Sequence, residues 1–386
     1  MITSRSYLDH AATTPLRVEA IAAITAELTR VGNPSSLHTS GRDARRVVEE
    51  SREVIASCLG ADPAEVIFTS GATEADNLAI KGGFRARPQA HTMITSAVEH
   101  HAVLESVESL AADGATVVLI RVDHDGRPDL DQLAAVLADR AEQIALISIM
   151  YANNETGVVA PIAGIAALAR AAGVPVHSDA VQAVGQLMID FAGSGLDALS
   201  LSAHKFGGPV GAGALLAKRD FALKPVQHGG GQERDVRSGT LDVAGIAGMA
   251  AALKASTDEL AGQAKRIRTL RNRLMDTVLG TIDRTELNCV RDPAASLPGI
   301  ANISFAGCEA DNLLMLLDQN GIDSSTGSAC TAGVSEPSHV LEAMGRTTRE
   351  ARSSLRFSLG HTSTDADVDR LLAVLPGAVE LARRAG

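Results

Sequence analysis

Two residues that can do chemistry stand at the ends of apolar segments. Lys205 follows the segment Leu199–Ser202, and Asp179 directly follows Val174–Ser178. Open α/β sheets bind ligands at the carboxyl ends of their strands. A lysine in that place is either a surface residue with its stem on apolar neighbours or a desolvated amine. In the second case burial lowers its pKa and makes it a nucleophile toward carbonyl compounds.

A third segment supplies a candidate anion site. The apolar run Val66–Phe68 passes through Thr69–Glu74, which contains Gly71, into a helical pattern. The first N–H groups of such a helix can bind a phosphate, although an ordinary Thr N-cap gives the same pattern. Pyridoxal 5′-phosphate needs a lysine for its carbonyl, an acid for its pyridinium nitrogen and a phosphate cradle. The three segments together predict that cofactor, whereas each alone does not.

A histidine pair and one cysteine are further candidates. His100 and His101 follow another predicted strand, and no other metal ligands stand at a recognisable spacing. An imidazole that stacks on a cofactor ring or carries protons fits better than a metal site, and a solvated helix cap is the alternative. Four cysteines are too few for a disulfide framework. Cys330 differs from the others because it lies among small residues, Ser324–Gly333, with nothing bulky to bury it.

The elements that must position these residues alternate along the chain from Arg42 to about Lys218. Amphipathic helical segments such as Arg42–Leu59, His101–Ala112 and Ile162–Ala172 separate many of the predicted strands. The predicted strands are Glu65–Thr69, His91–Ala97, Thr116–Val122, Ala145–Tyr151, Val174–Ser178, Ala198–Ser202 and Gly213–Ala217. This alternation predicts an α/β fold with a mostly parallel seven-stranded sheet sandwiched by helices.

The order of elements changes after a long helical pattern, Leu241–Leu279. Short strands then stand among helices, which predicts a smaller α+β domain. The strands are Glu286–Val290, Asn302–Phe305 and Leu355–Ser358, and the helices are Asp311–Asn320 and Thr364–Leu375. We expect a large cofactor-binding domain over residues 15–255. Residues 1–14 and 256–386 are expected to form the small domain, which carries the Cys330 segment.

Composition excludes several classes of protein. The 386 residues carry 35 Lys and Arg against 46 Asp and Glu, a net charge of −11, which argues against direct nucleic-acid binding. With 45% hydrophobic and 21% charged residues the chain is globular rather than disordered. No apolar run is long enough to span a membrane, and no signal peptide is visible, so the sequence predicts a soluble cytoplasmic protein with no membrane partner.

Ten segments, in order along nearly the whole chain, resemble the cysteine desulfurases of the NifS/IscS type. That family belongs to the class V, fold-type I pyridoxal-phosphate enzymes. The segments are Tyr7–Pro15, Gly32–Ser36, Ser70–Ala79, Asn153–Gly157, Asp179–Ala183, Ser202–Lys205, His228–Arg234, Arg237–Thr240, Gly327–Cys330 and Arg356–Gly360. Several are too long for chance agreement.

The resemblance implies a role for each matched residue. Lys205 would carry pyridoxal 5′-phosphate, His100 would stack on its ring as acid and base, and Cys330 would hold the persulfide. Asp179 would pair with the pyridinium nitrogen. Contacts to the ring hydroxyl would come from Gln182 and Asn154, and phosphate contacts from Ala72, Thr73, Ser202 and His204, with Thr240 from the other subunit of a homodimer. The substrate carboxylate would be bound by Arg356, with Asn33 and Asn154 nearby.

The implied reaction takes sulfur from L-cysteine and leaves L-alanine. The sulfur would pass from Cys330 to a protein acceptor, such as an iron–sulfur scaffold or a tRNA-thiolation protein. A selenocysteine lyase, an aminotransferase and a non-enzymatic sulfur-relay protein remain alternatives. The chain departs from the family at Gly207–Gly211, where the usual Tyr-Gly-Pro-Lys-Gly reads Gly-Gly-Pro-Val-Gly. The segment from Cys330 to Leu341 resembles the long, mobile loop of the NifS/IscS branch.

Overall fold

All seven predicted strands of the first part form one sheet, in the order β2-β8-β7-β6-β5-β3-β4. The computed structural model describes residues 5–327 and 336–385. The strands are β2 (Val66–Thr69), β3 (Thr92–Ser96), β4 (Thr116–Ile120), β5 (Ile144–Ser148), β6 (Val176–Asp179), β7 (Ala198–Ser202) and β8 (Gly213–Ala217). Only β8 runs against its neighbours, β2 and β7. The mostly parallel sheet that the sequence predicts is therefore confirmed.

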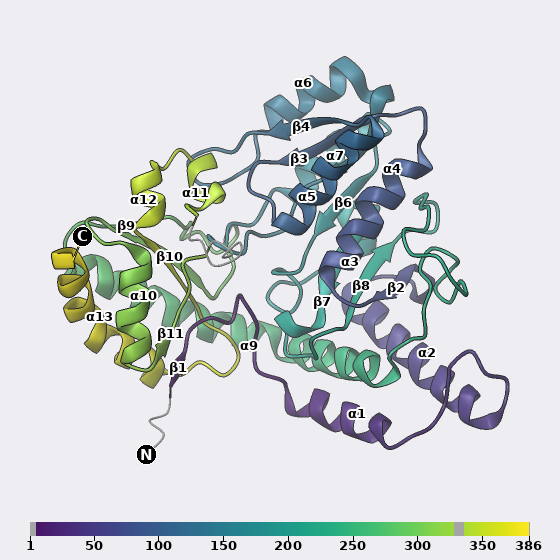
Figure 1. Cartoon of the computed structure of the whole chain (residues 1–386), viewed down its shortest axis with the longest axis horizontal. Helices are drawn as coiled ribbons and strands as arrows, with labels where there is room; N and C mark the ends of the chain where they lie inside the picture. The colour runs from purple at the N-terminus through teal and green to yellow at the C-terminus, as the bar shows by residue number, and fades with distance from the viewer. Residues whose placement is uncertain (1–4, 328–335, 386) are drawn as a thin grey trace.

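Helices cover both faces of this sheet (Figure 1). The alternation of side chains along a strand separates the two faces, as in β2, where Val66 and Phe68 enter one core and Ile67 the other. The helices on the first face are α2 (Thr39–Leu59), α6 (Leu130–Arg140), α7 (Ile162–Ala171), the short α8 (Phe191–Ser194) and the first half of α9 (Val243–Thr281). Those on the second face are α3 (Ala72–Asn77), α4 (Gly83–Ala86) and α5 (His101–Ser109). A helix α1 (Val18–Leu28) packs on α9.

A second group of elements forms a separate core. Strands β9 (Thr285–Leu287), β10 (Ile300–Phe305) and β12 (Ser354–Ser358) make an antiparallel sheet, and β1 (Ser6–Tyr7) pairs with β11 (Ile322–Asp323). The helices are α10 (Ala310–Gln319), α11 (His339–Ala343), α12 (Thr348–Arg352) and α13 (Asp365–Ala385). Phe305, Phe357 and Leu371 are fully buried in this core.

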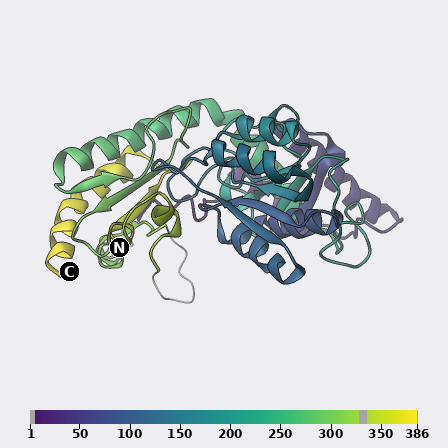
Figure 2. The same ribbon diagram turned by 90° about the horizontal axis from the view of Figure 1, so that it is seen from above.

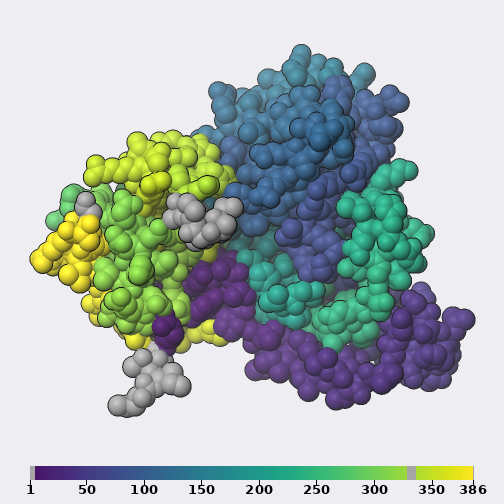
Figure 3. Space-filling view, in the orientation of Figure 1, coloured from purple at the N-terminus to yellow at the C-terminus, as the bar shows by residue number. Residues whose placement is uncertain are grey.

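One helix connects the two cores. On α9, Met249 and Leu253 belong to the core beside the large sheet, while Leu270 and Leu274 belong to the second core. Figure 2 shows the helix running from one half of the molecule to the other. The N-terminal segment, purple in Figure 3, lies between the halves on the visible face. The predicted domain boundary at residues 255 and 256 falls inside this continuous helix and stays a prediction.

The last helix is longer than the sequence pattern indicates. The predicted helix ends at Leu375, because a proline inside a helix removes a backbone hydrogen bond. In the structure α13 continues through Pro376 to Ala385. Ala378, Val379 and Ala382 beyond the proline are buried in the second core, and their burial outweighs the lost bond. Within residues 5–327 and 336–385, no helix combines the length and apolarity needed to cross a bilayer.

Candidate active site

A cavity of about 480 Å³ opens at the carboxyl ends of β2, β3, β5, β6 and β7. Parallel strands bring the residues that follow them to one edge of a sheet, which is why distant parts of the sequence meet here. Ten of the residues predicted for the site line this cavity. They are Ala72, Thr73, His100, Asn154, Asp179, Gln182, Ser202, His204, Lys205 and Arg356.

Lys205 lies just after β7 and is held by backbone oxygens. Its Nζ donates to the carbonyl oxygens of Ala11 (2.7 Å) and Ala12 (2.9 Å), and it forms no ion pair with any described residue. Burial, and secondarily the charge of Arg356, lowers the Lys205 pKa to about 8. A substantial fraction of this amine is therefore neutral and nucleophilic near neutral pH.

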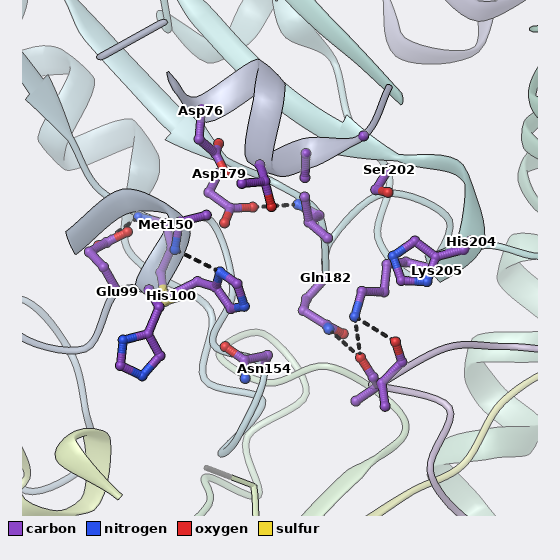
Figure 4. A pocket seen from close by; sticks show the side chains of 18 of the residues that line it. Asp76, Glu99, His100, Met150, Asn154, Asp179, Gln182, Ser202, His204 and Lys205 are labelled. Atoms are coloured by element: carbon purple, nitrogen blue, oxygen red, sulfur yellow. Dashed lines mark hydrogen bonds between the residues drawn. The ribbon is translucent and has the colours of Figure 1, made fainter. Parts of the chain in front are cut away.

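Asp179 and Gln182 face the same cavity from the end of β6 (Figure 4). The Val181 amide donates to Asp179 Oδ1 at 2.9 Å. Burial raises the pKa of Asp179, whereas His100 and Lys205 act against that rise. Gln182 Nε2 donates to the Ala11 carbonyl at 2.8 Å, but the buried Gln182 Oε1 has no partner among the described residues. An unpaired buried acceptor of this kind indicates a missing donor.

The turn between β2 and α3, called the cradle below, is suited to bind an anion. Gly71 is the N-cap residue, with φ of 152° and no side chain to accept from the first helical N–H groups. Gly213 on β8 comes so close that a Cβ there would lie 2.6 Å from Gly71 Cα. Ser202 and His204 line the cavity as well. Burial lowers the His204 pKa to about 4, which leaves its ring neutral.

His100 caps α5 and presents its second ring nitrogen to the cavity. Its Nδ1 accepts from the Ala102 amide at 3.1 Å, so the ring proton sits on Nε2. Burial lowers the His100 pKa, while the Asp179 charge acts to raise it. The ring is therefore neutral at neutral pH and presents the Nε2–H as a proton donor.

Arg356 on β12 is the buried cation of the cavity. The residue is 4% exposed, its Nη2 pairs with Asp9 Oδ1 at 2.7 Å, and its Nη1 donates to the Asn154 carbonyl at 3.0 Å. The buried Nε has no partner among the described residues. A guanidinium with a free N–H is suited to bind a carboxylate.

Three predicted site residues lie elsewhere. Asn33 is exposed in the connection between α1 and α2 and does not join Arg356 in lining the cavity of its own chain. Thr240 is also exposed and does not line the cavity of its own chain. Its predicted role is in the site of a partner chain, which stays a prediction. Cys330 lies outside the described residues. Burial raises the thiol pKa of each of the other three cysteines, Cys58, Cys289 and Cys308.

Five acids that line or border the cavity were not predicted as site residues: Asp9, Glu74, Asp76, Glu99 and Glu155. Glu99 is fully buried, and burial raises its pKa to about 8 even though Ser96 and the Met150 amide donate to it. All five stand inside the segments that resemble the cysteine desulfurases or next to a predicted site residue. That proximity was the available signal, and only folding reveals which of them point inward.

Comparisons with known proteins decide the family. The aminotransferase class-V profile matches residues 6–371. An IscS-like cysteine desulfurase of Mycobacterium tuberculosis is 56% identical over 385 residues, which cover 98% of each chain. The chain belongs to the cysteine desulfurases. A solved structure titled NifS-like protein superposes with a TM-score of 0.91 at 33% identity, over 98% of this chain and 100% of that one. The structure titled SspA in complex with cysteine has a TM-score of 0.79 at 31% identity and covers 92% and 98% of the two chains.

Cysteine desulfurases depend on pyridoxal 5′-phosphate, and the residues of this cavity fit that group. The Gln182 acceptor without a donor suits a ring hydroxyl, and the uncapped turn at Gly71 suits a phosphate. Lys205 supplies an amine with a lowered pKa, and Asp179 supplies the acid for a ring nitrogen. All of these groups line the same cavity of the desulfurase, so a single cofactor molecule could contact them together.

Proposed function

We propose that this desulfurase takes sulfur from L-cysteine and collects it as a persulfide on Cys330, leaving L-alanine. A bond forms between the Cys330 sulfur and the substrate sulfur as the substrate Cβ–S bond breaks. The electron pair of the broken bond stays on the carbon fragment, which gains a proton and leaves as alanine. Atoms and electrons balance without any added oxidant or reductant.

The chain's own residues would prepare the substrate for this transfer. When bound, pyridoxal phosphate supplies a sink for the electrons released at the substrate Cα. Arg356 would hold the substrate carboxylate through its free Nε. The Lys205 amine would take the Cα proton and return it, and the Nε2–H of His100 would donate a proton during the sulfur transfer. Asp179 would keep its negative charge beside the ring nitrogen.

One observation carries this proposal. Lys205, an amine with a pKa of about 8 and no carboxylate partner among the described residues, shares a cavity with Asp179 and a buried arginine. A relay protein that used only a cysteine would have no need of this arrangement. Folding must desolvate this amine, which costs stability, so the arrangement points to a chemical use of the amine.

The test separates the two nucleophiles. Cys330→Ser should keep the bound cofactor and bind cysteine, but should release less than about one-hundredth of the sulfide, because a hydroxyl cannot carry a persulfide. The matched controls Cys58→Ser, Cys289→Ser and Cys308→Ser should keep activity within the range of packing losses. Mass spectrometry of the wild-type enzyme after one turnover should find the added sulfur on Cys330. Sulfur on one of the other three cysteines would contradict the proposal.

The partners follow from the same chemistry. A protein acceptor, such as an iron–sulfur scaffold or a tRNA-thiolation protein, would receive the sulfur. We further propose a homodimer with shared sites, a cytoplasmic location, and a large domain over residues 15–255 with a small one from residues 1–14 and 256–386. The two hydrophobic cores that share α9 support that division.

A further inference from the structure

A buried carboxyl group behind the cavity has no evident partner. Asp76 lies on α3, is 0% exposed, and neither of its carboxylate oxygens makes a hydrogen bond with a described residue. It borders the same cavity as Asp179 and Lys205. Burying an unpaired carboxylate costs much free energy, so the protonation state of Asp76 must be explained.

His177 on β6 does not neutralise Asp76. Its Nε2 lies 3.7 Å from Asp76 Oδ1, beyond hydrogen-bond distance. Both ring nitrogens are already engaged, Nδ1 with Ser148 Oγ and Nε2 with Ser200 Oγ, each at 2.9 Å. Burial lowers the His177 pKa to about 3, so the ring is neutral at pH 7. His177 therefore provides no positive charge to Asp76.

A second acid lines the same cavity as Asp76. Figure 4 shows the carboxyl groups of Asp76 and Asp179 beside each other at the back of the cavity. Burial first, and then the Asp179 charge, hold the pKa of Asp76 well above its usual range; the Ser200 hydroxyl acts against this rise, and the Glu99 charge adds to it. His100 and Lys205 act on Asp179 and oppose the rise of its pKa. Two adjacent carboxyl groups in such a setting do not both ionise.

We propose that Asp76 is a positioning residue that shares a single proton with Asp179, so that the pair presents one negative charge to the ring nitrogen of the cofactor. Asp179, which also receives the Val181 amide, carries that charge. Asp76 holds the proton and shares it with Asp179, while the Ser200 hydroxyl beside the same carboxyl group acts to lower its pKa. This role rests on the proposed function, in which Asp179 pairs with the ring.

The sign of the resulting pH dependence follows from proton binding. In the unfolded chain Asp76 titrates near its ordinary pKa of about 3.9. The folded protein keeps the proton to higher pH, so above about pH 4 it binds more protons than the unfolded chain. The free energy of unfolding therefore falls as the pH rises above about 4. Below that pH both states bind the proton, and Asp76 causes no loss of stability. Asn cannot ionise, so Asp76→Asn removes this loss.

The first measurement uses the apoprotein and needs neither cofactor nor substrate. The difference in thermal midpoint, Asp76→Asn minus wild type, should rise by at least ~2 °C between pH 4 and pH 8. The exposed Asp220→Asn should show a constant difference over that range. Any fixed effect of the amide on packing cancels in this comparison. A constant difference for Asp76→Asn would overturn the proposal, and Asp76→Ser provides the same readout if the Asn variant does not fold.

The second measurement uses the holoenzyme with the cofactor labelled with ¹⁵N at the ring nitrogen. The ¹⁵N chemical shift of Asp76→Asn should match the wild-type shift of a protonated ring, whereas Asp179→Asn should lose it. Loss of ring protonation in Asp76→Asn would show that Asp76 bears the charge, against the proposal. Failure of both variants and the wild type to bind the cofactor would instead contradict the proposed function and leave the apoprotein result standing.

Discussion

Lys205 is the residue whose chemistry depends most on its surroundings. Because its pKa is about 8, we expect the covalent attachment of pyridoxal phosphate to the apoprotein to rise with pH and level off above about pH 9. Borohydride reduction followed by mass spectrometry measures this attachment at each pH. Lys205→Ala should bind the cofactor without a bond that borohydride fixes.

The same titration tests the cause of the lowered pKa. Arg356 is the second cause after burial, so Arg356→Gln should move the midpoint of attachment to higher pH. The control Arg349→Lys changes an exposed residue on α12 and should leave the midpoint in place. Reduction that still fixes cofactor to an active-site lysine in Lys205→Ala would refute the assignment.

Arg356 also gives a prediction for substrate binding. Lysine has no planar fork of N–H groups, so Arg356→Lys cannot contact Asp9 and a substrate carboxylate at once. We expect kcat/KM for cysteine to fall by at least roughly tenfold, mostly through KM. Steady-state kinetics measure this, with Arg349→Lys as the control that keeps wild-type values. Unchanged kinetics in Arg356→Lys would move the carboxylate site elsewhere.

At the scale of elements, the cradle depends on the close approach of β8 to the turn before α3. An added Cβ in Gly213→Ala would lie 2.6 Å from Gly71 Cα and 2.8 Å from the Leu201 oxygen, both backbone atoms that cannot rotate away. We expect a loss of about 1–3 kcal/mol in the free energy of unfolding. The affinity for pyridoxal phosphate should fall as well, because the turn that binds the phosphate must move.

The long helix provides the matched control for that change. Gly262 lies on α9 with no atom within 4 Å of an added Cβ, so Gly262→Ala should stabilise the helix by up to about 1 kcal/mol. Denaturation and cofactor titration of both variants check the pair of predictions. A Gly213→Ala enzyme that binds cofactor as tightly as wild type would show that the cradle tolerates separation of β2 and β8.

At the scale of the whole molecule, the segment Arg237–Thr240 tests whether sites are shared between two chains. Arg237 Nε pairs with Glu74 at 2.7 Å beside the cradle of its own chain, while Thr240 is exposed. In a two-fold dimer Thr240 would reach the partner's cofactor. A variant with residues 238–240 replaced and Lys205→Ala should each be nearly inactive. Mixed dimers, isolated with two tags, keep one intact site and should recover about half of wild-type activity.

The outcome against this prediction is equally clear. Mixed dimers with no more activity than either parent, or an active monomer, would mean that each site is built within one chain. Differently tagged wild-type chains, combined by the same protocol, provide the control for subunit exchange.

The sequence by itself determined the sheet and the residues at its edge. Periodicity and β-branched composition are local properties, so the strands before Lys205 and Asp179 were recognisable, and parallel strands must end together. The motifs that resemble the family added the roles of Gln182 and Ser202, which periodicity does not reveal.

Tertiary structure alone decided which side chains meet across long stretches of chain. Asp9 and Arg356 are 347 residues apart and pair only because β12 packs beside the N-terminal segment. The length of α13 depended on burial beyond Pro376, and the place of Asn33 depended on how α1 and α2 pack. In the sequence Asp76 is one polar residue of a helical pattern, and only the fold buries it completely. Burial and long-range contact are properties of the packed chain, and a local pattern carries no record of them.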